Sequence, residues 1–233
     1  MIQHLLQLIW NQRKQNAWLW AELLLVSVFL WFLVDYLYVM GRTYTAPLGF
    51  DIRHTYSIVI SSLSERSPDY IPKEKRERPD GVHLLTALDR IRTYPGVESA
   101  CLTDGGMPYY MGSRNLVWRI DTLQVPCRYA FVTPEFFDVF RIYDKDGKTA
   151  SLKRAIEDNN SIVISADVET MNPGLSLLGQ KAYRGNVTDE IEETIRGISV
   201  PIRRHEYTKA EPNVYRALRL SRMEEGYYEG MID

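Results

Sequence analysis

The feature that most constrains this chain is a long apolar run near its N-terminus. Residues 17 to 40 read AWLWAELLLVSVFLWFLVDYLYVM, and their only charged side chains are Glu22 and Asp35. Roughly 20 helical residues cross a bilayer core, so this run predicts a transmembrane helix. Because the two acids are about 13 residues apart, or about 20 Å along a helix, we expect each to lie near one edge of the hydrocarbon layer.

Aromatic side chains at both ends of the run support this placement. Trp18 and Trp20 lie near one end, and Tyr36 and Tyr38 near the other. Amphipathic rings of this kind prefer the headgroup level of a membrane. The charge-free part of the run, Leu23 to Val34, is also followed by Asp35 and bulky side chains rather than by the small residues that a signal peptidase requires. We therefore expect an uncleaved anchor and not a signal peptide.

The segment before the anchor, residues 1 to 16, predicts a short interfacial helix. Its leucines form an apolar face and Arg13 and Lys14 a basic end, a combination typical of helices that lie on a membrane surface. The two cations favour a cytoplasmic N-terminus by the positive-inside rule, and the main domain would then lie outside the cytoplasm. One alternative stays open, in which residues 1 to 40 form a helical hairpin packed on a soluble domain.

The amino-acid composition indicates that the remainder of the chain, residues 41 to 233, is an ordinary globular region. Hydrophobic residues make up 45% of the chain and charged residues 25%, which is typical of a folded domain. The 28 basic and 30 acidic residues give a net charge of only -2, so no overall field favours a nucleic-acid partner. Cys101 and Cys127 could form a disulfide in an oxidising compartment, or could be two buried apolar side chains.

Hydrophobic periodicity and turn residues predict an α+β fold for this region. A helix over 82–93, with Asp80 as its cap, separates two predicted strands and suggests a β-α-β unit. A hairpin turns at Asp121 and Thr122. The predicted strands are 56–63, 97–102, 116–120, 124–131, 161–165, 194–202 and 214–220, and a last helix is predicted over 223–232.

The segment from 133 to 140, TPEFFDVF, carries a strong helix-start pattern. Thr133 is a capping residue type, Pro134 suits the first helical position, and Glu135 suits the first turn. The three aromatic residues that follow, Phe136, Phe137 and Phe140, are expected to be buried.

Motifs that carry chemistry are missing from the sequence. The four histidines, His4, His54, His83 and His205, have no metal-ligand spacing. No nucleophile motif and no phosphate-binding loop is present, so we expect no enzymatic activity, no cofactor and no metal. A basic cluster, Arg203 to His205, could hold an acidic partner or could be solvated loop charge.

The order of segments along the chain resembles the MacB-like and FtsX-like permeases of ABC transporters. The segments that carry the resemblance are the apolar anchor, GRTYTAPLGFD, FVTPEFFDVF, SIVIS, LLGQ and GISVPIRRHEYTKAEPNVYRAL. The most specific is the family's TPEFFxVF stretch, which this chain matches at Thr133, Pro134, Glu135, Phe136, Phe137 and Phe140. None of these residues is catalytic in the family, so the weight lies in their order and spacing.

The resemblance implies an inner-membrane permease with four helices, whose periplasmic domain lies between the first two. Lobe one would comprise 52–103 and 201–233, and lobe two about 104–200. Such permeases transmit the motion of a cytoplasmic ABC ATPase to the periplasmic side and drive export. This sequence has one predicted span and ends inside a predicted helix, so we expect it to be a fragment of the longer protein.

Partners implied by the resemblance are a cytoplasmic ABC ATPase subunit, a second copy or a related permease, a periplasmic adaptor or substrate protein, and membrane lipid, with no nucleic acid. The second hypothesis for function is a single-pass sensor or binding module that recognises a ligand or protein outside the cytoplasm. A membrane-anchored enzyme is the third and has the least support.

Overall fold

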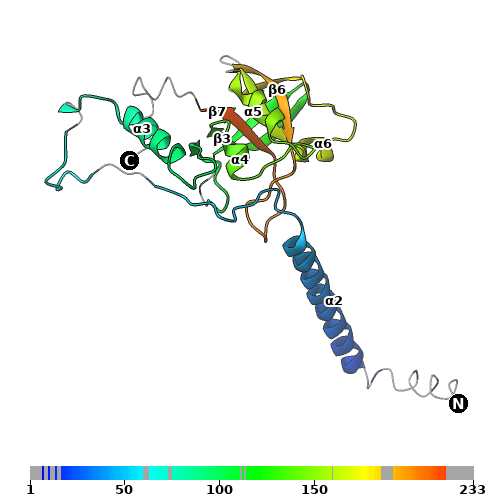
Figure 1. Cartoon of the computed structure of the whole chain (residues 1–233). Coiled ribbons are helices and arrows are strands. Elements are labelled where there is room, and N and C mark those ends of the chain that lie inside the picture. The colour runs from blue at the N-terminus through cyan, green and yellow to red at the C-terminus, as the bar shows by residue number, and fades with distance from the viewer. Residues whose placement is uncertain are drawn as a thin grey trace. The chain divides into compact units, whose positions relative to one another are not determined.

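A computed structural model describes residues 7, 10, 14, 17–59, 63–72, 75–110, 112, 114–158, 160–184 and 191–218. These fall into two units, residues 1–46 and residues 47–233. The first unit contains helix α2 (Ala17–Thr45), which is long and apolar enough to cross a membrane (Figure 1). It confirms the helix predicted for residues 17 to 40 and continues it to Thr45. Apart from residues 7, 10 and 14, the predicted interfacial helix lies outside the described residues.

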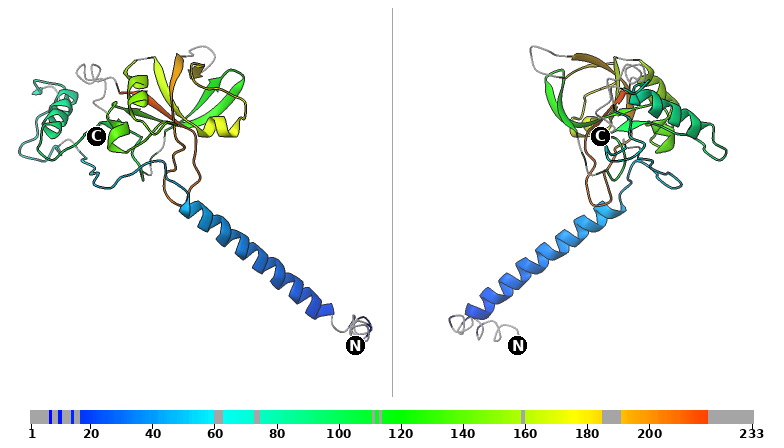
Figure 2. Two further views of the ribbon diagram at one scale, coloured as in Figure 1. Left: turned by 45° about the vertical axis from the view of Figure 1, so that its right-hand side comes forward. Right: turned by 90° about the vertical axis from the view of Figure 1, so that its left-hand side faces the viewer.

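The second unit is built around a mixed seven-stranded sheet that closes on itself (Figures 1 and 2). Its strands follow the order β1-β3-β2-β5-β6-β4-β7, with an additional pairing between β3 and β7. The strands are β1 (Thr103–Asp104), β2 (Asn115–Ile120), β3 (Leu123–Val132), β4 (Ser161–Ser165), β5 (Lys181–Arg184), β6 (Ile191–Ser199) and β7 (Asn213–Ala217).

Strand β3 closes the sheet into a barrel because it forms hydrogen bonds along both of its edges. On one edge the amide of Tyr129 donates to Arg114 O, beside β2, and on the other the amide of Arg128 donates to Pro212 O, beside β7. The resulting barrel has no free edge between β3 and β7, and free edges are what expose a sheet to unwanted pairing.

Side chains alternate across the strands, so the barrel has two separate apolar clusters. Trp118, Cys127 and Ile162 belong to the cluster that the strands enclose. Val163 and Tyr215 project from the outer face and belong to the second cluster. Trp118 is fully buried.

Two short helices cover the outer face. Helix α4 (Phe136–Val139) contributes Phe136, Phe137 and, at its C-terminal end, Phe140, while α5 (Ala150–Glu157) lies against β4 and β6. Gly197 permits the close approach of α5, since a Cβ there would lie 2.8 Å from Val163 Cγ2 and 3.0 Å from Ala155 Cβ. The three phenylalanines are buried, as predicted. Helix α6 (Asp167–Met171) follows β4.

The hairpin of β2 and β3 and the strand over 161–165 are confirmed, and the strands predicted over 194–202 and 214–220 are found at Ile191–Ser199 and Asn213–Ala217. Helix α5, helix α6 and strand β5 were not predicted. The helix predicted over 223–232 lies outside the described residues.

Two predicted strands are wrong. Residues 56–59 and 63, the described part of the first, form no strand, and Tyr56 and Val59 are more than four-fifths exposed. Residues 97–102 are irregular, and a strand begins only at Thr103. Apolar β-branched composition predicts a strand only where a neighbouring strand supplies hydrogen bonds. The predicted β-α-β unit is therefore wrong, although its helix exists as α3 (Asp80–Arg92).

Both predicted helix caps are also wrong. Asp80 is the first residue of α3 and pairs with Arg76, while Pro79 occupies the capping position without a side-chain hydrogen bond. Thr133 lies two residues ahead of the α4 cap, Glu135, and its hydroxyl instead accepts a hydrogen bond from the amide of Leu102 at 3.2 Å. In each case another partner uses the polar group that a cap would need: Arg76, four residues earlier in the chain, for Asp80 and the distant amide of Leu102 for Thr133.

The outer apolar cluster predicts a large effect of truncation at Phe137, which is 0% exposed. Phe137→Ala should lower the free energy of unfolding by about 3–5 kcal/mol, because a buried aromatic ring is replaced by a cavity. Urea unfolding of the full chain in detergent, followed by near-UV circular dichroism, measures the change. Tyr94→Ala, at a side chain that is 69% exposed, is the control and should change the stability by less than about 0.5 kcal/mol.

Candidate functional site

The segment that directly follows the anchor, residues 47–55, is fastened to the barrel domain and is called the strap here. The amide of Asp51 donates to Phe140 O at 2.9 Å, and the amide of Arg203 donates to Leu48 O at 2.9 Å. These two bonds tie the strap to the end of α4 and to the β6–β7 connection. The strap is thus bound on both sides through backbone groups.

Gly49 allows the strap to reach this position. Its φ is +83°, a left-handed conformation that favours glycine, and a Cβ added there would lie 2.1 Å from Pro201 O. Both the backbone conformation and the close approach to Pro201 therefore require the absence of a side chain.

Phe50 anchors the strap in the apolar interior. Its ring packs against the outer cluster and meets the ring of Tyr109 edge to face, with centroids 5.7 Å apart at 87°. The Tyr109 hydroxyl in turn bonds to Glu206 on the β6–β7 connection. The strap, the segment after β1 and the β6–β7 connection are therefore joined through one aromatic pair.

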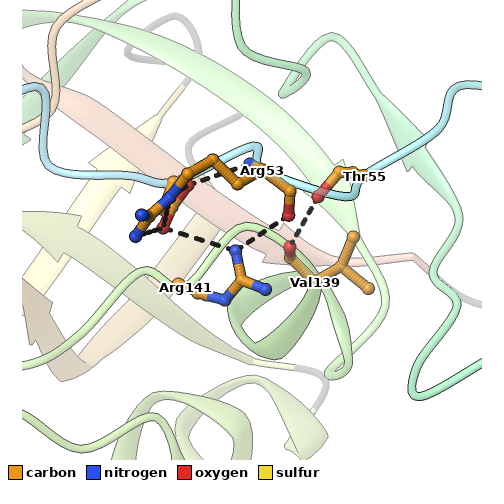
Figure 3. A network of polar contacts seen from close by, with 5 residues as sticks. Arg53, Thr55, Val139 and Arg141 are labelled. Atoms are coloured by element: carbon orange, nitrogen blue, oxygen red, sulfur yellow. Dashed lines mark hydrogen bonds and ion pairs between the residues drawn. The ribbon is translucent and has the colours of Figure 1, made fainter.

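A polar network holds the outer side of the strap (Figure 3). Asp51 pairs with Arg53 at 2.7 Å and with Arg141 at 3.4 Å, and Arg141 also donates to Arg53 O at 3.1 Å. The Thr55 hydroxyl donates to Val139 O at 3.4 Å, so α4 accepts hydrogen bonds from two strap residues. Hydrogen bonds from Arg53 hold the pKa of the Asp51 carboxyl well below its usual range, with a smaller contribution from the charge of Arg141.

Arg141 occupies the left-handed position after α4, with φ of +50°. Its amide donates to Asp138 O and that of Ile142 donates to Phe137 O, the bonding pattern that usually ends a helix with glycine. An arginine there costs more than a glycine would, and its guanidinium meets the strap. The sequence did not single out Gly49 or Arg141, because a glycine carries no sign of the backbone that it will lie against and no local pattern marks Arg141.

The residues of the TPEFF stretch lie beside the strap. Phe136, Phe137 and Phe140 belong to the outer cluster, against which Phe50 packs. Glu135 forms an ion pair with Arg92 at the end of α3, at 2.8 Å. Pro134 is half-buried ahead of α4. The structure thus brings together two segments that carried the sequence resemblance, GRTYTAPLGFD and FVTPEFFDVF, although 79 residues of sequence lie between them.

The predicted membrane-edge residues all lie on α2 with exposed side chains: Trp18, Trp20, Glu22, Asp35, Tyr36 and Tyr38. Within the first unit no other described element covers the apolar surface of this helix. Their placement at the two membrane surfaces stays a prediction.

The side chains of the basic cluster, Arg203 to His205, lie in different environments on the β6–β7 connection. Arg203 is 4% exposed, and its guanidinium donates to Thr208 O at 2.7 Å and to Glu206 O. It fastens its own loop and is therefore not available to hold a partner. Arg204 is half-buried beside a small cavity, and His205 accepts a hydrogen bond from the amide of Tyr207.

Both cysteines are free thiols. Cys127 belongs to the cluster inside the barrel and Cys101 packs on the cluster outside it, so no disulfide joins them. Burial raises the pKa of each thiol to about 12. Among the described residues, no group of three or more histidine, cysteine, aspartate and glutamate side chains could hold a metal ion, and His54, His83 and His205 lie on separate segments.

No protein-family model matches the sequence, and no curated protein matches it. Solved structures do match. A domain from Porphyromonas gingivalis described as a permease is 20% identical, with a TM-score of 0.41, and the match covers 57% of this chain and 50% of that one.

Two further matches are the periplasmic region of MacB from Actinobacillus actinomycetemcomitans and the extracellular domain of the noncanonic ABC-type transporter YknZ from Gram-positive bacteria. The first is 10% identical, with a TM-score of 0.40, and the match covers 68% of this chain and 62% of that one. The second is 12% identical, with a TM-score of 0.42, and the match covers 72% and 74%. These proteins are of the kind that the sequence resemblance names.

The polar network predicts how the Asp51 carboxyl titrates. Because its folded-state pKa is lowered, the network stabilises the strap fully above the unfolded pKa of about 3.9, and the stabilisation is lost as the pH falls below that value. In an NMR titration of the full chain in micelles, Asp51 should titrate clearly below pH 3.9. Arg53→Gln should raise this midpoint more than Arg141→Asn does, since Arg53 provides the larger effect. A wild-type midpoint near 3.9 would contradict the network.

Proposed function

We propose that this chain is a permease-type subunit of an ABC exporter, and that the strap transmits displacement of the membrane helix to the barrel domain. The observation that carries the proposal is the attachment of the strap, which begins two residues after α2 ends and is fastened by Asp51 to α4, by Leu48 to Arg203, and by Phe50 to the core. A segment held at three points transmits force, whereas a flexible linker absorbs it.

Several features of the chain support a transmitting role. The order of its segments resembles that of MacB-like permeases, and two of the segments that carry the resemblance, GRTYTAPLGFD and FVTPEFFDVF, meet at the strap. A closed barrel is a stiff body, because each of the strands β2 to β7 is paired on both sides. Displacement of the strap would therefore move the barrel as a unit rather than distort one edge of it.

The proposal includes an orientation and partners. The N-terminus would lie in the cytoplasm and residues 47–233 in the periplasm, with α2 in the inner membrane. ATP would be hydrolysed by a separate cytoplasmic ABC ATPase subunit. A second copy or a related permease would complete the membrane assembly, a periplasmic adaptor or substrate protein would meet the barrel domain, and the two-lobed division of that domain would follow the family.

Capture of the ATPase tests the proposed partner. Affinity-tagged chain, isolated with its complexes from native membranes, should retain an ABC ATPase subunit after mild crosslinking. A tagged single-span protein of unrelated function is the control. Absence of any enriched ATPase would overturn the permease role and favour the sensor or binding module.

Gly49→Ala tests the transmitting role. The added methyl would meet Pro201 O, so the strap should leave its position, and a change in amide exchange of the barrel on adding a non-hydrolysable ATP analogue should be lost while the ATPase stays bound. Gly96→Ala is the matched control, because Gly96 also has a positive φ, +92°, but has nothing within 4 Å of an added Cβ. Both substitutions cost about 1–2 kcal/mol of backbone strain. Equal responses of the two variants would contradict transmission through the strap.

A further inference from the structure

A small cavity of about 30 Å³ lies on the outer face of the barrel, beside the strap. Its walls come from the Gly105–Gly106 turn, from β3 at Arg128 to Ala130, from the start of β7 and from Ile202 to Arg204, and Phe50 of the strap also lines it. Gly106 cannot be enlarged, since a Cβ there would lie 2.8 Å from the Ala130 Cβ. The cavity therefore has fixed walls formed by segments distant in sequence.

Two arginines line this cavity, Arg128 and Arg204, and neither forms an ion pair with an acid among the described residues. The Nε of Arg128 is buried and has no hydrogen-bond partner among the described residues, while its Nη2 donates to Gly112 O at 3.3 Å. For Arg204, the described part of the chain provides no side-chain hydrogen bond or ion pair. Burial lowers the pKa of Arg128, as does the nearby charge of Arg204, and the charge of Glu211 opposes this only in part.

Two other arginines of the same domain have hydrogen-bond acceptors for their guanidinium groups. Arg216 donates to Glu193 from its Nε at 2.7 Å, and Arg203 donates to two carbonyl oxygens of its own loop. A partly buried cation that faces a second cation is unfavourable unless an anion joins them. The Arg128 and Arg204 side chains are thus suited to binding a negatively charged group, and they do not stabilise the protein without one.

We propose that this cavity is a binding site for a carboxylate group, held jointly by Arg128 and Arg204. Guanidinium groups present paired donors that match the two oxygens of a carboxylate. The small size of the cavity favours the same ligand class, since a flat, three-atom carboxylate head needs less room than a tetrahedral phosphate.

The carboxylate could belong to a free small acid or to an acidic side chain of a peptide, and the two sources share the same recognition chemistry. Phe50 lines the cavity from the strap, so a bound carboxylate would also stabilise the strap in its fastened position. The site is independent of the export role and would serve a sensor equally well.

Ligand-dependent thermal unfolding of the full chain in detergent tests the site. Acetate and N-acetylglutamate amide are the two carboxylate probes, with chloride at equal ionic strength as the reference and phosphate as the competing anion class. A saturable rise of the unfolding midpoint is expected with one or both carboxylates. A rise with acetate assigns the site to free acids as well, and a rise with the glutamate probe alone assigns it to acidic peptides.

Arg204→Gln should weaken carboxylate binding about 10- to 100-fold, the effect of losing one charge-assisted hydrogen bond. Arg154→Gln, at an exposed arginine of α5, is the matched control and should bind as the wild type does. Arg204→Glu supplies a carboxylate beside Arg128, so it should raise the midpoint without ligand and abolish the response to acetate. Equal responses of the wild type and Arg204→Gln, or a response to phosphate alone, would overturn the proposal.

Discussion

Strand β3 pairs with β2 along one edge and with β7 along the other, and the positions of the remaining elements depend on this double pairing. The pairing closes the barrel, and it also determines where the chain leaves β3 at Val132. From there the TPEFF stretch turns directly into α4, whose C-terminal carbonyl groups face the strap. Closure of the barrel thus positions the acceptors to which the segment after the membrane helix is bonded.

The charged groups of the barrel fall into two classes that differ in function. Glu193 is 2% exposed. It pairs with Arg216 and, at 3.5 Å, with Arg184, so one acid lies between two cations of the barrel. Breaking such a buried pair leaves an uncompensated charge, and the cluster therefore acts as a structural element. Among the residues that the structure describes, no such acid lies between Arg128 and Arg204. The same chain thus distinguishes arginines that maintain the fold from arginines that can receive a ligand.

Local signals made part of this structure predictable. The anchor is recognised from its length and aromatic ends, the β2–β3 hairpin from its alternation and turn, and the buried phenylalanines from a helix-start pattern. The segment over 56–63 has equally strong β-forming composition, yet its described residues pair with no strand, because pairing depends on a partner that composition does not encode. Helix α5 and strand β5 are short and are stabilised mainly by the barrel that they cover or complete.

The candidate site was the least predictable part, because its contacts link distant residues. Glycine is a common turn residue, but only the folded chain shows that the backbone at Gly49 lies against Pro201. Arg141 adopts a left-handed conformation without any sequence signal, and the meeting of Arg128 with Arg204 requires the closure of β3 onto β7. Sequence order nevertheless identified both segments that meet at the strap.

Hydrogen exchange of individual strap amides tests most directly whether the strap is a rigid connection. In the full chain, the amides of Asp51 and Arg203, which donate to Phe140 O and Leu48 O, should exchange nearly as slowly as the amide of Ala166, which donates to Ser199 O in the barrel. Amides in the exposed segment 56–59 provide the fast reference. Exchange of Asp51 and Arg203 at that fast rate would show a flexible linker and would contradict transmission through the strap.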